Sequence, residues 1–110
     1  MKQYVIDELR PQDQEKIKTY MDAHFGPADM GNIYWIPLDP VLYDSTQQSH
    51  DECSPFYFTV QLSSTSFSAE LLVRTKNRIR CDCIQHATQE QFFWLIRFVD
   101  AIFERLGIMS

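Results

Sequence analysis

Residues 56–74 read FYFTVQLSSTSFSAELLVR, and this stretch decides the fold class. Large apolar side chains alternate with polar ones on both sides of a Ser/Thr-rich centre, which is typical of two half-buried strands joined by a tight turn. Pairing Ser63 with Ser66 agrees with this pattern, because it brings the apolar side chains together on one face. We therefore expect an antiparallel hairpin with three apolar pairs: Leu62 with Phe67, Val60 with Ala69 and Phe58 with Leu71.

Further strands extend this hairpin on both sides. Residues 79–85 have the pattern of a strand, and a three-residue loop before it sets Val73 opposite Cys81. Residues 32–38 form another, which its proline confines to a sheet edge because proline has no N–H to donate. Residues 4–7 have the pattern of a short additional strand.

Two helices flank the strands. The first begins at Pro11, which suits the first helical position, and ends at Gly26. The second opens with a capping box formed by Thr88 and Gln91 and ends near Gly107. Its apolar stripe comprises Phe92, Leu95, Ile96, Val99, Ile102, Phe103 and Leu106.

The pattern predicts a single α+β domain spanning residues 1–110, with elements in the order α-β-β-β-β-α. In it, a four-stranded antiparallel meander carries the N-terminal and the C-terminal helix on one face. A chain of 110 residues, 45% of them hydrophobic, has material for one core and no room for a second. Residues 39–55 have a turn-like composition, and a loop of this length often carries function or moves.

Charge and targeting signals limit the class of partner. The net charge of -5 disfavours binding to nucleic acids and to anionic membranes. No apolar run approaches the roughly 20 residues of a membrane span, and the first residues lack the pattern of a signal peptide. We therefore expect a cytoplasmic protein that binds neither nucleic acid nor membrane.

Basic residues concentrate around the predicted second turn, at Arg74, Lys76, Arg78 and Arg80. The expected register places Arg74 opposite Arg80, and like charges in that position destabilise a strand pair. Either Asp51 and Glu52 neutralise them, or the cluster binds a small anionic ligand or an acidic protein segment.

The three cysteines are candidates for a metal site or a nucleophile. Cys53 follows His50 by three residues, which resembles half of a zinc site and is also the only Cys–His pair suited to catalysis. The expected register separates Cys53 from Cys81 by on the order of 14 Å. We therefore expect Cys81 and Cys83 to pack in the core as small apolar side chains, with no metal, cofactor or catalytic residue.

Trp94 and Phe98 lie on the C-terminal helix opposite its apolar stripe, flanked by Arg97 and Arg105. Either residues 26–55 cover these rings, or the rings form a protein interface, whose centres are enriched in Trp and Arg. Most soluble oligomers are symmetric dimers, so the second alternative predicts a homodimer.

These features predict a non-catalytic interaction or regulatory module that self-associates. The main support is the lack of any glycine-rich phosphate loop or acid–base motif in so small a chain. The alternative is a protein that binds a small anionic ligand, or a minor enzyme, with its site between residues 39–55 and the sheet.

Overall fold

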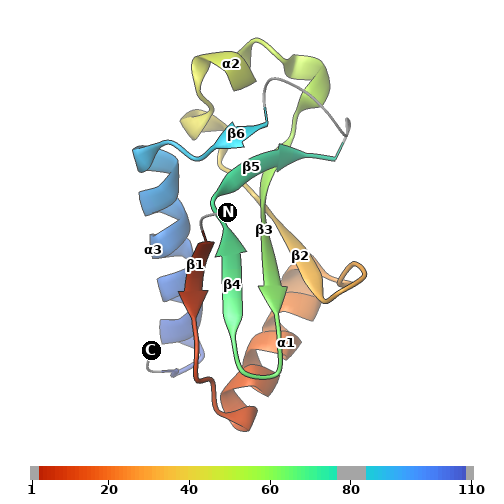
Figure 1. Cartoon of the computed structure of the whole chain (residues 1–110), viewed down its shortest axis with the longest axis vertical. Coiled ribbons are helices and arrows are strands. Elements are labelled where there is room, and N and C mark those ends of the chain that lie inside the picture. Colours follow the sequence, from red (N-terminus) through yellow and green to blue (C-terminus); the bar gives the residue numbers. More distant parts are fainter. Residues whose placement is uncertain (1–2, 77–83, 109–110) are drawn as a thin grey trace.

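A computed structural model describes residues 3–76 and 84–108, which form an α+β domain with two layers (Figure 1). Its main elements are β1 (Gln3–Ile6), α1 (Pro11–Phe25), β2 (Ile33–Pro37), β3 (Phe56–Leu62), β4 (Phe67–Glu70), β5 (Leu72–Thr75), β6 (Gln85–His86) and α3 (Gln89–Arg105). Both predicted helices and the strands on either side of the first turn are confirmed.

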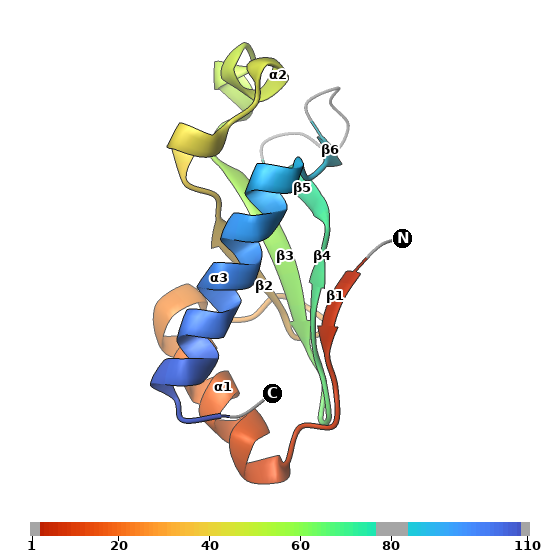
Figure 2. The same ribbon diagram turned by 90° about the vertical axis from the view of Figure 1, so that its left-hand side faces the viewer.

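The sheet is antiparallel throughout, and β3 lies at its centre. β2 pairs with one side of β3, while β4 and β5 pair with successive parts of its other side. β6 pairs with β5, so the predicted meander is confirmed, and β1 adds a further strand beside β4. Figure 2 shows α1 and α3 on the same face of the sheet, and no described helix lies on the opposite face, which we call the open face.

The expected hairpin register is correct near the turn and wrong further along. Leu62 pairs with Phe67 and Val60 with Ala69 as predicted, but the chain bends at Leu71. Beyond the bend the pairs are shifted by two residues, so that Phe56 lies opposite Thr75. A shift of two keeps every side chain on its own face, and the bend separates β4, beside β1, from β5, beside β6.

The register expected for the following strand is also wrong. Val73 pairs with Gln85 instead of Cys81, and Leu72 pairs with His86. The alternation of side chains specifies which face is buried but not how long the connection is, so it cannot distinguish registers that differ by an even number of residues. The predicted positions of Cys81 and Cys83 fall within 77–83, outside the described residues.

Local signals at the helix ends are confirmed. Thr88 and Gln91 form the predicted capping box of α3. At the other end Gly107 has a φ of 71°, which glycine adopts without strain. Backbone bonds from Gly107 N to Glu104 O and from Ile108 N to Phe103 O satisfy carbonyls that would otherwise lack partners.

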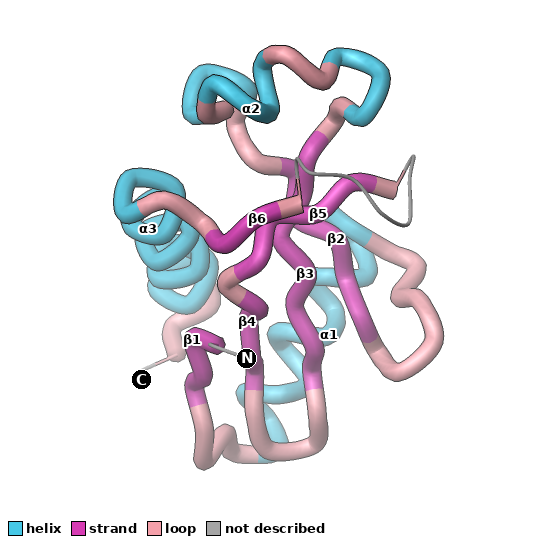
Figure 3. The backbone as a smooth tube through the Cα atoms, turned by 45° about the horizontal axis from the view of Figure 1, so that its top comes forward, coloured by secondary structure: helices cyan, strands magenta, loops and turns pink. Residues whose placement is uncertain are grey.

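Short helical turns occupy the segment expected to be a loop (Figure 3). They are η1 (Pro40–Leu42), α2 (Ser45–Gln48) and η2 (Asp51–Cys53). The fully buried Gln91 of α3 donates to the Leu42 carbonyl and to Gln47 Oε1, each over 2.9 Å. This segment is therefore attached to the start of α3 through buried amide groups.

Candidate functional site

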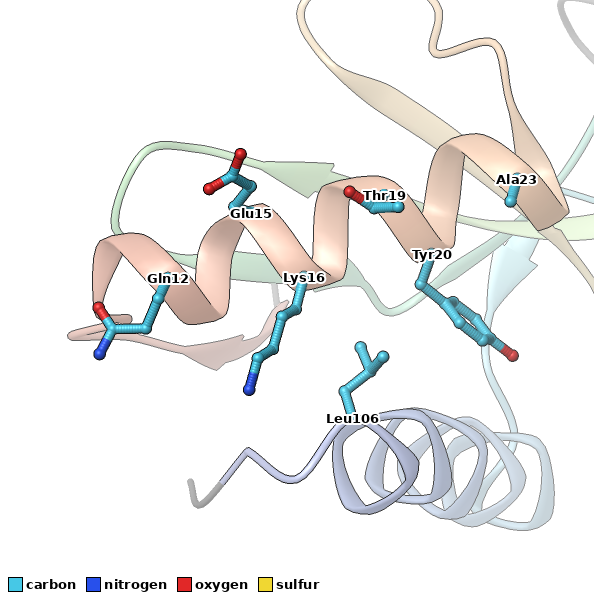
Figure 4. A pocket seen from close by; sticks show the side chains of 7 residues that line it. All are labelled: Gln12, Glu15, Lys16, Thr19, Tyr20, Ala23 and Leu106. Atoms are coloured by element: carbon cyan, nitrogen blue, oxygen red, sulfur yellow. The ribbon is translucent and has the colours of Figure 1, made fainter.

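A groove of about 610 Å³ lies between α1 and the end of α3 (Figure 4). Lys16 and Tyr20 extend from α1 towards α3, and Leu106 extends from α3 towards α1. A smaller hollow of about 190 Å³ shares Tyr20 and continues along α3 past Phe98, Ala101, Ile102 and Arg105. We refer to the two hollows together as the α1–α3 groove; it includes Phe98 and Arg105, two of the four residues predicted for an interface.

The groove exists because each helix buries its main apolar stripe in the sheet. Ile17 and Met21 of α1 are fully buried, as are Leu95 and Val99 of α3. Side chains on the flanks that face each other, such as Tyr20, remain half-buried. The exposed area of the groove is mostly apolar, although Gln12, Glu15, Lys16 and Thr19 of α1 also line it, and exposed apolar surface of this kind is common where proteins bind one another.

The aromatic rings of α3 are less exposed than the sequence predicts. Trp94 stacks on the buried Phe58 at a centroid distance of 6.2 Å and on Phe98 at 5.1 Å. Phe98 in turn contacts Phe25 of α1 at 5.9 Å. Both rings are therefore partly buried against the core, with Phe58 of the sheet beside Trp94 and Phe25 of α1 beside Phe98, and neither of these neighbours belongs to residues 26–55.

The outer surface of α3 lies next to the groove. Arg97, Ala101, Glu104 and Arg105 are all exposed, and Phe93 is 47% exposed. The predicted interface residues Arg97 and Arg105 are therefore accessible, whereas Trp94 and Phe98 are half-buried.

Arg74 is neutralised by a carboxylate that sequence reasoning missed. Its guanidinium donates to Glu70 over 2.8 and 3.0 Å, and Thr59 Oγ1 donates to the same carboxylate over 2.7 Å. Of the two alternatives, neutralisation within the chain applies to Arg74, but the carboxylate is Glu70 instead of Asp51 or Glu52. The bend at Leu71 lets two side chains four positions apart in sequence meet on the open face of the sheet.

Lys76 also has an internal contact. Its ammonium lies 5.0 Å from the ring centroids of both Trp35 and Tyr57, a cation–π arrangement on the open face. Arg78 and Arg80 lie outside the described residues. The ion pair with Glu70 and these ring contacts weaken the case for anion binding at Arg74 and Lys76.

Replacing Glu70 with Gln is expected to lower the free energy of unfolding by about 1–2 kcal/mol, because Arg74 and Thr59 lose a charged acceptor. Burial alone would raise the pKa of Glu70, but the hydrogen bonds from Arg74 and Thr59 and the charge of Arg74 outweigh it and lower the pKa. The stabilisation is therefore present at neutral pH and is lost as the pH falls below the ordinary pKa of a glutamate and through the lowered pKa of Glu70.

Urea unfolding of both proteins at several pH values measures this effect. The difference between wild type and Glu70→Gln should be largest near pH 7 and shrink in acid. Glu8→Gln, a change at an exposed carboxylate outside the α1–α3 groove, is the matched control and should change stability by less than about 0.5 kcal/mol. A difference that does not depend on pH would contradict the ion-pair account.

The turn that carries Cys53 places three metal-binding side chains together. One ligand atom each from His50, Glu52 and Cys53 lie within 4.8 Å of one another. Thr75 Oγ1 donates to the Cys53 carbonyl, so this turn lies against the end of β5. The register behind the expected separation of Cys53 from Cys81 is wrong, since Phe56 pairs with Thr75, and Cys81 itself lies outside the described residues.

The sequence places Leu106 in the apolar stripe of the C-terminal helix, and the helical spacing of Tyr20 from Ile17 and Met21 predicts a core position for Tyr20 as well. The only available signal for Tyr20 was its hydroxyl, which usually stays near water or a partner when the ring is buried. For Leu106 the signal was its position at the C-terminal cap of α3, where the helix ends. Neither signal indicates that α1 and the end of α3 lie beside each other.

No helix within the described parts of the chain is long and apolar enough to span a membrane. A scan against models of known protein families gives no match, and comparisons with curated proteins and with solved structures give none either. Functional inference for this chain therefore depends on the geometry of its own residues.

Proposed function

We propose that the protein is a small non-catalytic interaction module that self-associates through the α1–α3 groove and the outer surface of α3. The observation that carries this proposal is the apolar groove itself, about 610 Å³ in its larger part, bordered by exposed charged residues of the helical face. The occupant is a second copy of the chain.

The distribution of charge favours a second copy over an acidic or a basic partner. Arg97 and Glu104 are both exposed on α3 and lie two turns apart, on either side of Ala101. A helix that carries a positive charge at one end and a negative charge at the other can pair with a second copy of itself. The two-fold axis of a dimer reverses the helix direction in the partner, so that opposite charges meet. An acidic partner would match only the cations.

The small side chain of Ala101 supports a particular arrangement. Two copies of α3 that cross in antiparallel directions at Ala101 can approach closely, since no large side chain separates them at the crossing point. Arg97 of one copy then lies within one turn of Glu104 of the other. Phe93 and Tyr20 lie at the margins of this contact and add apolar area.

Sedimentation of the wild-type protein over a range of concentrations tests this proposal. We expect a dimer at high micromolar concentration and a folded monomer for Ala101→Glu, because a buried carboxylate at the crossing point is strongly unfavourable. Ala101 is exposed, so the substitution should leave the fold intact. Val41→Glu, at a side chain that is 79% exposed and outside the groove, should remain dimeric.

A charge exchange makes the same test specific to α3. Arg97→Glu and Glu104→Arg should each weaken the dimer, and the double variant should recover part of the lost affinity. A wild-type protein that stays monomeric, or an Ala101→Glu variant that dimerises as well as wild type, would overturn the proposal.

A further inference from the structure

We infer that His50, Glu52 and Cys53 form a binding site for a divalent transition metal ion of the zinc class. This inference is independent of the proposed dimer, since the three residues lie in η2 and its flanking residue, away from the α1–α3 groove. One ligand atom of each lies within 4.8 Å of the other two, and His50 Nδ1 lies 4.0 Å from Glu52 Oε1.

The backbone explains why these side chains converge. In a 3₁₀ turn the residues at i and i+3 lie almost directly above one another. Here Cys53 N donates to His50 O over 2.9 Å, so His50 and Cys53 share one side of the turn. Glu52 completes the group from the outer side, with a side chain that is 58% exposed.

The turn is held in place from several directions. His50 N donates to Gln47 O, and Ser54 Oγ donates to Asp51 O. Thr75 Oγ1 donates to the Cys53 carbonyl and fastens the turn to β5. A metal ion bound here would not need to organise a disordered loop, which favours binding because less conformational entropy is lost.

The donor set fits a particular class of ion. A thiolate with an imidazole and a carboxylate suits Zn²⁺ and Co²⁺, whereas Mg²⁺ and Ca²⁺ prefer oxygen ligands alone. Around tetrahedral zinc, neighbouring ligand atoms lie roughly 3.5 Å apart, given bond lengths of about 2.0–2.3 Å. The present separations therefore need to close by only about 1 Å, which side-chain rotation supplies.

Burial gives the site a direction of entry. Cys53 is fully buried, while the side chain of His50 is 28% exposed. An ion would approach from the side of His50 and Glu52 and reach the sulfur last. Three protein donors leave one position of a tetrahedral ion for a ligand outside this group, as in zinc sites that bind water.

Titration of the reduced protein with Co²⁺ tests this inference. Cobalt bound to a thiolate has a near-ultraviolet charge-transfer band, and tetrahedral cobalt has strong visible bands. We expect both at one equivalent, with displacement by Zn²⁺. Cys53→Ser should remove the charge-transfer band, and circular dichroism must show that this variant is folded.

Substitutions at the other two ligands keep the test informative if Cys53→Ser does not fold. His50→Ala should weaken Co²⁺ affinity at least tenfold, since even the loss of an outer partner costs roughly 10–100-fold. Glu52→Gln should weaken it less, because its side chain is the most exposed of the three. His24→Ala and His86→Ala, which change exposed histidines, are the matched controls and should bind like wild type.

Three results would overturn the inference. The first is wild-type protein that shows no cobalt bands at one equivalent. The second is a charge-transfer band that persists in folded Cys53→Ser, since the thiolate would then come from another cysteine. The third is an equal loss of affinity in His50→Ala and in the two control histidine variants.

Discussion

Replacing Phe58 with alanine is expected to lower the free energy of unfolding by about 3–5 kcal/mol, a large part of the total stability of a domain of this size. Phe58 is fully buried on the central strand β3, and its ring lies against Trp94. Its removal leaves a cavity between the sheet and α3, and the antiparallel sheet on one side cannot move to fill it.

Urea unfolding monitored by circular dichroism measures this loss. Tyr57→Phe is the matched control, because Tyr57 is the next residue on β3 but its side chain lies on the open face. The phenylalanine ring keeps the contact with Lys76, so stability should change by less than about 0.5 kcal/mol. A loss of less than about 1 kcal/mol for Phe58→Ala would show that the aromatic stack does not support α3.

Gln91→Ala is expected to lower the free energy of unfolding by about 2–4 kcal/mol. The substitution leaves the Leu42 carbonyl without its donor, at a cost of about 1–3 kcal/mol for a buried group. It also removes the bond to Gln47 and the reciprocal half of the capping box, in which Thr88 N donates to Gln91. The first turn of α3 and the segment from η1 to η2 should both open more often, because the bonds that join them are lost.

Gln89→Ala provides the control, since Gln89 lies in the first turn of the same helix and is exposed. Its effect should stay within about 0.5 kcal/mol. Hydrogen exchange supplies a second readout. The backbone amides of residues 40–53 should exchange faster in Gln91→Ala than in the wild-type protein, and they should exchange at the wild-type rate in Gln89→Ala. Equal stability of the two variants would mean that the buried amide pair contributes nothing to the attachment of this segment.

The Gln91 result also bears on the proposed metal site. Gln47 links α3 to the turn, because its carbonyl accepts from His50 N while its side chain accepts from Gln91. If the attachment of this turn preorganises the three donors, Gln91→Ala should weaken Co²⁺ binding although it changes no ligand. This effect distinguishes a preorganised site from a chance grouping of side chains in a mobile loop.

The parts of this fold that could be predicted from sequence depend on interactions between near neighbours. The capping box of Thr88 and Gln91 and the stop at Gly107 are complete within a few residues, so their chemistry is visible in the sequence itself. The alternation in residues 56–70 specifies which side chains are buried, and the short turn then sets the register of the pairs next to it.

The candidate site was predicted only in part. Arg97 and Arg105 were identified as exposed charges on α3, and they are exposed. Tyr20 and Leu106 were missed, because a groove between two helices depends on how far apart the sheet holds them. The spacing of His50 and Cys53 indicates half of a metal site, but the expected register predicts that Cys53 lies too far from Cys81 to share an ion with it.

Hydrophobic alternation and helix caps are local, so the α+β class, the limits of both long helices and the pairing of Leu62 with Phe67 follow from the chain's own residues. The bend at Leu71, the pairing of Arg74 with Glu70 and the half-burial of Trp94 could be seen only in the folded structure. Each of these depends on which distant surface lies against the residue, and the energy of such contacts has no local pattern in the chain.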